Sequence, residues 1–231
     1  MPAVPDPSVL SSFHLFAGLT PEQLSALNNQ LHRKVFPSGS NLMTAEQSGE
    51  VVYFILEGTV KIYVEQADGT TIILAILGPG NTLGEMSVVD NAGRSANVVT
   101  IENSTLLWMD RAAFQQSLRT IPGIAFNLAR ILSGRLRLAN EQIQALAALE
   151  VENRVARQLL AFAEQYGQTL PGGDILIPIR LTQSDIAGLV GASRERINQV
   201  IVAYKEWKYI SVDHSQHITI HNQKALAKRC V

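Results

Sequence analysis

The chain has 231 residues, of which 46% are hydrophobic and 17% are charged, and its formal net charge is −1. These proportions suit a globular protein with hydrophobic cores and room for one large or two small domains. The single cysteine, Cys230, excludes a disulfide within the chain and a cluster held by four thiolates of one chain.

No apolar run approaches the ~18 residues that a membrane-spanning helix needs, and the N-terminal sequence lacks the basic start and apolar core of a secretory signal. We therefore expect a cytoplasmic protein with no membrane partner. The charge is uneven: residues 180–231 carry eight Lys and Arg against four Asp and Glu, which leaves +4 there and −5 on the rest. A basic end on an acidic body indicates, weakly, a polyanionic partner.

The first 110 residues change from a helical to a β pattern. Short helices are predicted within residues 8–30, where Thr20-Pro21-Glu22 is a start signal with proline at the first helical position. Residues 33–110 contain short runs of β-branched and aromatic residues separated by glycines, which favour an antiparallel roll or barrel. Asp68-Gly69 is a two-residue hairpin signal. The clearest runs are residues 51–56, 59–64, 70–77, 96–101 and 104–109.

Residues 111–165 favour helix. An apolar stripe at the spacing of a coiled-coil seam runs along them, formed by Leu132, Leu136, Ala139, Ile143 and Leu146. Only about two heptads are present, and so short an amphipathic helix needs a partner. That partner is either the domain's own core or a second copy of the chain in a two-fold dimer.

Residues 181–201 predict a helix-turn-helix. Thr182 is a candidate N-cap, Gly191 is a stop that can take a positive φ, and Ser193 is a second N-cap. The second helix turns Ile197, Val200 and Ile201 inward and leaves a polar outer face, formed by Arg194, Glu195, Asn198 and Gln199. Such a face can read bases in a DNA major groove, although an ordinary helical hairpin gives a similar pattern.

The flanks of this segment predict strands. A glycine-rich break at 171–174 precedes an apolar strand at 175–179, and residues 209–222 alternate as a hairpin, or wing, around a turn at 213–216. The wing holds three neighbouring histidines: His214, His217 and His221. An exposed polar strand face is favoured over a zinc site there, and we assign no metal.

Residues 83–98, LGEMSVVDNAGRSANV, carry a candidate nucleotide site. Gly84-Glu85 begins a short helical turn whose free N–H groups can donate to a phosphate. Arg94 adds a bidentate phosphate contact, Ser95 adds a hydroxyl, and the Glu85 carboxylate can accept from a ribose. An internal Arg94–Glu85 ion pair that holds the loop together is an equal alternative.

Together, the glycine-punctuated roll, the GEMSVVDNAGRSA cassette, the long helix and the GASRERINQ segment resemble the cyclic-AMP receptor protein branch of the CRP/FNR family of bacterial transcription regulators. The resemblance implies an α+β fold: an antiparallel β-roll, a long dimerisation helix and a C-terminal winged helix-turn-helix. The expected domains are a β-roll sensor with N-terminal helices at 1–114, the dimerisation helix at 115–149 and the DNA-binding domain at 150–231.

The resemblance also implies roles for individual residues. The ligand set is Gly84, Glu85, Met86, Arg94, Ser95, Arg135, Ala139 and Asn140. The family places hydroxyl side chains against the adenine where this chain has Ala139 and Asn140, so the preference for a purine is expected to differ. The DNA-reading set is Thr182, Ser193, Arg194, Glu195, Arg196 and Gln199. Gln199 stands where the family has a second base-reading arginine, so part of the half-site code is expected to differ.

The resemblance predicts a homodimeric regulator that binds pseudo-palindromic double-stranded DNA, is controlled by cyclic AMP and contacts RNA polymerase. The effector set contains no metal, iron–sulfur cluster or haem, because a cysteine cluster is lacking and His14 or His32 alone makes no haem case. The sequence has no GxSxG, HExxH or P-loop motif, so we expect no enzyme. The alternatives are a regulator with a vestigial site or another ligand, and a cyclic-nucleotide adaptor without DNA binding.

Overall fold

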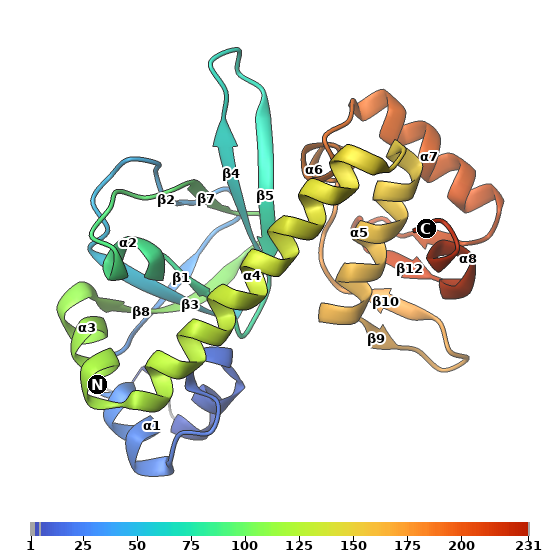
Figure 1. The fold of residues 1–231 in the computed structure, drawn as a ribbon. Coiled ribbons are helices and arrows are strands. Elements are labelled where there is room, and N and C mark those ends of the chain that lie inside the picture. Colours follow the sequence, from blue (N-terminus) through green and yellow to red (C-terminus); the bar gives the residue numbers. More distant parts are fainter. Residues whose placement is uncertain (1–2, 5, 231) are drawn as a thin grey trace. The chain divides into compact units, whose positions relative to one another are not determined.

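The computed structural model describes residues 3–4 and 6–230, which form two compact units (Figure 1). Of the described residues, the first unit comprises those up to residue 64 together with 74–137, and the second comprises 65–73 together with 138–230. No helix within the described residues is both long and apolar enough to span a membrane.

The N-terminal segment is helical, as predicted. Two 3-10 helices, η1 (Pro7–Ser12) and η2 (His14–Phe16), precede α1 (Pro21–Asn28). Thr20 caps α1 through a capping box with Gln23, in which each side chain accepts from the other residue's backbone N–H. The helices close one end of a core in which Phe13, Phe16 and Phe54 pack with ring centroids 4.9–5.9 Å apart.

Two four-stranded sheets form the predicted β-roll, and every strand predicted from the clearest runs is present. One sheet has the order β1-β8-β3-β6 and the other β2-β7-β4-β5. The pairs β1–β8, β3–β8, β3–β6, β2–β7 and β4–β7 are antiparallel. The strands are β1 (His32–Phe36), β2 (Asn41–Met43), β3 (Val51–Glu57), β4 (Val60–Glu65), β5 (Thr71–Leu77), β6 (Thr82–Leu83), β7 (Asn97–Thr100) and β8 (Ser104–Asp110).

The hairpin between β4 and β5 lies where Asp68-Gly69 predicts it, but its loop is longer than two residues. The Gln66 N–H donates to the Thr70 carbonyl at 2.9 Å, which leaves three residues in the loop. Gly69 takes a φ of +84° at the third of these positions. A three-residue loop of this kind requires a left-handed residue at its end, and glycine supplies it.

A short helix, α2 (Glu85–Val89), lies within the roll. The helical stretch after the roll is divided into three helices: α3 (Arg111–Thr120), α4 (Pro122–Ala148) and α5 (Val151–Tyr166). Pro122 starts α4 because proline lacks an N–H and disfavours helical geometry in the preceding Ile121, whose φ and ψ are −123° and 89°. On α4 most of the predicted apolar stripe is exposed: Leu136, Ile143 and Leu146 are 63%, 64% and 54% exposed, whereas Leu132 is partly buried against the core of the first unit.

The second unit contains the predicted helix-turn-helix and wing. In its antiparallel sheet β11-β12-β10-β9, Ile220 lies opposite both Ile210 and Ile175. The glycine-rich segment is the turn between β9 and β10, because the Leu170 N–H donates to the Asp174 carbonyl at 2.8 Å. The elements are β9 (Gln168–Thr169), β10 (Ile175–Ile177), α6 (Gln183–Val190), α7 (Arg194–Glu206), β11 (Ile210–Val212), β12 (Ile218–Ile220) and α8 (Gln223–Ala227).

Tyr204 is the largest fully buried side chain of this unit, and it ties α7 to α5. Its hydroxyl donates to the Glu152 carbonyl at 2.7 Å, and burial raises the pKa of the phenol. The Arg229 guanidinium lies over the rings around it, 4.5 Å from the Trp207 centroid and 5.7 Å from that of Tyr204. The unit therefore has its own core, which supports the outer face of α7.

Candidate functional site

Gly84 initiates α2 in a conformation that only glycine adopts without strain. Its φ and ψ are +79° and 7°, and a Cβ at this position would lie 2.3 Å from Arg94 Nη1 and 2.7 Å from Met43 Cε. Glycine is therefore required at position 84 for two reasons: the backbone turns there into α2 with a positive φ, and Arg94 fills the space that a side chain would need.

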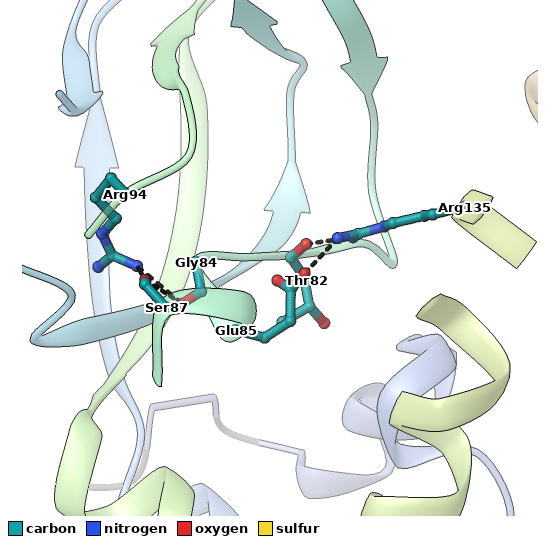
Figure 2. Close-up of polar contacts among 6 residues, drawn as sticks. All are labelled: Thr82, Gly84, Glu85, Ser87, Arg94 and Arg135. Atoms are coloured by element: carbon teal, nitrogen blue, oxygen red, sulfur yellow. Dashed lines mark hydrogen bonds and ion pairs between the residues drawn. The ribbon is translucent and has the colours of Figure 1, made fainter. Parts of the chain in front are cut away.

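Arg94 is the buried cation of the cassette. It is 8% exposed, and its Nη1 donates to the Gly84 carbonyl at 2.8 Å and to Ser87 Oγ at 2.7 Å (Figure 2). Its Nη2 donates to the Val51 carbonyl at 2.6 Å. All three acceptors are neutral, and burial lowers the pKa of Arg94, an effect that the nearby Tyr53 and Glu85 oppose.

Glu85 faces a different arginine from the one that the alternative interpretation assigned to it. Within the described part of the chain, its Oε1 forms an ion pair with Arg135 of α4, and Arg94 has no ion-pair partner. Arg135 also donates from Nη2 to the Thr82 carbonyl at 2.7 Å. Figure 2 shows the two arginines reaching the segment from Thr82 to Ser87 from opposite sides.

Two polar atoms beside this ion pair are buried without a hydrogen-bond partner among the described residues: Glu85 Oε2 and Thr82 Oγ1. A buried carboxylate oxygen without a donor is unfavourable by roughly 1–3 kcal/mol, and more when it is charged. Glu85 is only 1% exposed, so solvent does not reach it directly. The site therefore combines a buried guanidinium without a counter-ion and a carboxylate oxygen that lacks a donor.

The other predicted ligand residues are exposed. Met86 of α2 is 45% exposed, and Ser95 lies at the surface just before β7. Ala139 and Asn140 are exposed on α4 and belong to the second unit. The structure thus brings Gly84, Glu85 and Arg94 together with Arg135.

Ser87, Val51 and Thr82 hold the two arginines and were not among the predicted site residues. Val51 and Thr82 act through backbone carbonyls, which leave no trace in the side-chain pattern. Ser87 is 3% exposed on α2, and its hydroxyl also donates to the Gly84 carbonyl at 3.2 Å. The sequence offers one signal for Ser87: it is a polar residue within the short predicted helical turn that begins at Gly84-Glu85.

The helix-turn-helix forms through the caps that its sequence predicts. Thr182 Oγ1 accepts from the Asp185 N–H at 3.1 Å and also donates to the Asp185 carboxylate. Gly191 ends α6 at a φ of +63°, and Ser193 Oγ accepts from the Arg196 N–H at 3.2 Å to begin α7. The three predicted inward residues of α7 are buried: Ile197, Val200 and Ile201 are 0%, 4% and 5% exposed.

The outer face of α7 is polar and exposed, as predicted. Arg196 Nη1 donates to Gln199 Oε1 at 3.1 Å, and Gln183 of α6 donates to Asn198 Oδ1 at 2.9 Å. The backbone N–H of Glu195 donates to its own carboxylate, and with the Ser193 hydroxyl this lowers the pKa of the carboxyl. Glu195 therefore presents a charged acceptor beside Arg194 at the start of the helix.

Two of the three wing histidines, His217 and His221, contact carboxylates. His217 Nδ1 lies 3.1 Å from Asp213 Oδ2, while His221 lies 2.7 Å from Asp174 and 2.9 Å from Ser211 Oγ. Among the residues with described positions, no group of three His, Cys, Asp or Glu side chains is arranged to hold a metal.

Two family models match the chain. Residues 33–120 match the cyclic nucleotide-binding domain, and residues 153–229 match the Crp-like helix-turn-helix domain. The CRP-like cAMP-activated global transcriptional regulator of Mycobacterium tuberculosis is 34% identical over 96% of this chain and 98% of that protein. The cyclic AMP receptor protein of Thermus thermophilus is also 34% identical, over 83% of this chain and 85% of that protein.

Solved structures agree with these matches. The Thermus thermophilus catabolite activator protein covers 94% of this chain and 98% of its own, with a TM-score of 0.53 and 30% identity. FixK2 from Bradyrhizobium japonicum covers 87% of this chain and 98% of its own at a TM-score of 0.76 and 18% identity, which shows a shared fold.

Proposed function

Since the chain belongs to the CRP family of DNA-binding transcription regulators, with a cyclic nucleotide-binding domain and a Crp-like helix-turn-helix, we propose that cyclic AMP binds its β-roll and controls DNA binding by a homodimer. The family consists of regulators rather than enzymes. An adaptor without DNA binding, the alternative from another class, does not account for the helix-turn-helix match.

The proposal rests on two buried groups of the cassette: the Arg94 guanidinium, which has no counter-ion among the described residues, and Glu85 Oε2, which has no hydrogen-bond donor there. The Arg94 guanidinium is buried against three neutral oxygens, and a cyclic phosphate brings the negative charge that it lacks. Glu85 Oε2 lacks a donor, and a ribose hydroxyl supplies one. A ligand that carries an anionic phosphodiester next to a sugar hydroxyl satisfies both at once.

Cyclic AMP is the first candidate because the two relatives described above are named for it. In this proposal Gly84, Glu85 and Met86 line the ribose and phosphate, Ser95 adds a hydroxyl to the phosphate, and Asn140 faces the base. Asn140 can pair with adenine N6 and N7, as amides do in DNA recognition. Another cyclic nucleotide is the second candidate, because Ala139 and Asn140 lack the hydroxyls that the resemblance places there.

The proposed dimer pairs two copies of α4 through its exposed apolar stripe. Each α7 then presents Arg194, Glu195 and Gln199 to one half of a pseudo-palindromic DNA site, while Thr182, Ser193 and Arg196 support the contact at the starts of α6 and α7. The proposed setting is the cytoplasm, with RNA polymerase as a further partner.

The proposed coupling works through the contacts of Glu85. Because Arg135 of α4 already binds Glu85, a ligand that bonds Glu85 changes the contacts of α4 as well. A ligand shifts such an equilibrium only through its different affinities for the two arrangements, and a coupling of about 1–3 kcal/mol is ordinary.

Isothermal titration of the full chain with cyclic AMP, cyclic GMP and AMP tests the ligand, and gel shifts on a selected duplex with and without each nucleotide test the control. We expect cyclic AMP to bind and to raise DNA affinity, while AMP, which lacks the cyclic phosphodiester, does neither. DNA binding that ignores every nucleotide would refute the proposed control, and a stronger response to cyclic GMP would reassign the ligand.

A further inference from the structure

The connection between α4 and α5 is only two residues long, and the Leu149 carbonyl within it has no backbone partner inside either helix. Leu149 and Glu150 separate the helices, and Glu150 begins α5 with extended backbone and no side-chain cap. The last carbonyls of a helix have no partner within it and carry partial negative charge. The Leu149 carbonyl at the end of α4 is such a group, and so are the Val190 and Gly191 carbonyls at the end of α6.

One side chain binds all three of these carbonyls. Arg154, on the first turn of α5, donates from Nε to the Val190 carbonyl at 2.8 Å, from Nη1 to the Leu149 carbonyl at 2.8 Å and from Nη2 to the Gly191 carbonyl at 3.2 Å. Each nitrogen of the guanidinium thus has its own acceptor. These residues all belong to the second unit.

Apolar packing reinforces the same connection. A Cβ on Gly191 would lie 3.2 Å from Leu146 Cδ2, so the last full turn of α4 lies close to the turn between α6 and α7. That turn is held from its other side by the Gly191 and Ala192 N–H groups, which both donate to the Ala187 carbonyl. The start of α7 follows two residues later.

From this arrangement we infer that Arg154 is a positioning residue for DNA reading. Its guanidinium fixes the end of α6, and with it the start of α7, to the end of α4. We infer no contact between Arg154 and DNA; Arg154 sets the position of Arg194 and Glu195 at the start of α7. Only a planar fork of separate donors spans three carbonyls on two helices, so lysine is not an equivalent replacement.

The test compares R154Q and R154K with R157Q in the full chain. Arg157 is the matched control, because it lies one turn further along α5 and pairs with Glu141 of α4 at 2.9 Å in an exposed contact. The readout is the ratio of affinities for a duplex selected by the unmodified protein and for a scrambled duplex of equal length. A loss of stability alone lowers the folded fraction but leaves this ratio unchanged.

We expect R154Q to reduce the ratio at least tenfold, R154K to give an intermediate loss and R157Q to leave it unchanged. Hydrogen exchange of the Gly191 and Ala192 amides should accelerate in R154Q and R154K but not in R157Q. A ratio retained in R154Q, or an equal loss in R157Q, would overturn the inference. If R154Q does not fold, a retained ratio in R154K overturns it. The selection is run with and without cyclic AMP, so a missing nucleotide response counts against the proposed control and not against the role of Arg154.

Discussion

Arg135 forms an ion pair with Glu85 although the two residues stand 50 positions apart, one on the long helix α4 and the other at the start of α2 in the cassette. The Glu85 side chain is 2% exposed and the Arg135 side chain 30%, so the contact lies at the edge of the buried site. The Glu85 carboxylate thus links the cassette to α4: Oε1 is paired with Arg135, and Oε2 has no donor among the described residues.

Replacing Arg135 tests this relationship. Arg135→Gln leaves the Glu85 charge without its partner, and we expect the free energy of unfolding to fall by about 1–3 kcal/mol and cyclic AMP affinity to fall with it. Denaturant unfolding and isothermal titration measure the two effects. Arg130→Gln, at an exposed position on the same helix, should change stability by less than about 0.5 kcal/mol. Equal effects of both variants would deny the pair a specific role.

Arg94→Gln removes the buried positive charge. Losing one partner of a buried, hydrogen-bonded charge pair weakens binding by about 2–5 kcal/mol, so we expect the Kd for cyclic AMP to rise by at least ~30-fold. The Val51 and Gly84 carbonyls also lose a donor, so some stability is lost, and circular dichroism at the titration temperature controls for folding. Unchanged binding by a folded variant would show that Arg94 serves the loop alone.

Gly84→Ala places a Cβ where the chain has neither the backbone freedom nor the space for it. A non-glycine residue at this φ is strained by about 1–3 kcal/mol, and the collision with Arg94 Nη1 adds to the strain. We expect urea unfolding to show a loss at the upper end of this range or beyond. Gly134→Ala is the contrasting control, because Gly134 lies within α4 with no atom near its Cβ position and should gain about 0.5–1 kcal/mol. Similar losses in both variants would contradict the proposed crowding.

Local structure was the part of the fold that the sequence predicted best. The caps at Thr20, Thr182 and Ser193 and the left-handed Gly191 join residues three or four positions apart, so their partners can be read directly from the chain. The β runs were equally visible, because their glycine turns and branched residues mark each strand. The loop after β4 was misjudged by one residue because the turn uses a bulge, which the dipeptide Asp68-Gly69 does not reveal.

The long-range contacts of Arg94 and Arg154 could not be predicted from the sequence. Arg94 binds the carbonyl of Val51, 43 positions away, and Arg154 binds that of Val190, 36 positions away. Every residue has a backbone carbonyl, so the sequence of side chains does not show which carbonyl an arginine will bind. The Arg94–Glu85 pair is wrong for a different reason: the two residues are close in sequence, but the fold brings Arg135, 50 positions from Glu85, to the carboxylate.

Arg194→Ala tests direct base reading by α7. The side chain is exposed at the first position of the helix, and loss of a bidentate contact to guanine weakens DNA binding by about 1–3 kcal/mol. We expect the loss to be confined to duplexes with the preferred base pair, so that discrimination at one position relaxes in competition gel shifts. Lys205→Ala, at the other end of α7, should leave discrimination intact. A uniform loss over all sequences would make Arg194 a phosphate contact instead.

The exposed stripe on α4 tests the proposed dimer. Leu136 and Ile143 are 63% and 64% exposed, and a charge placed there faces its own copy across a two-fold interface. We expect Ile143→Asp to shift sedimentation from dimer to monomer and to abolish binding to a full palindromic site. Leu146 is a less clean position because it also lies against Gly191. Gln144→Asp adds the same charge one residue off the stripe and should leave the dimer intact. An intact dimer in Ile143→Asp would place the interface elsewhere and assign the stripe a different partner.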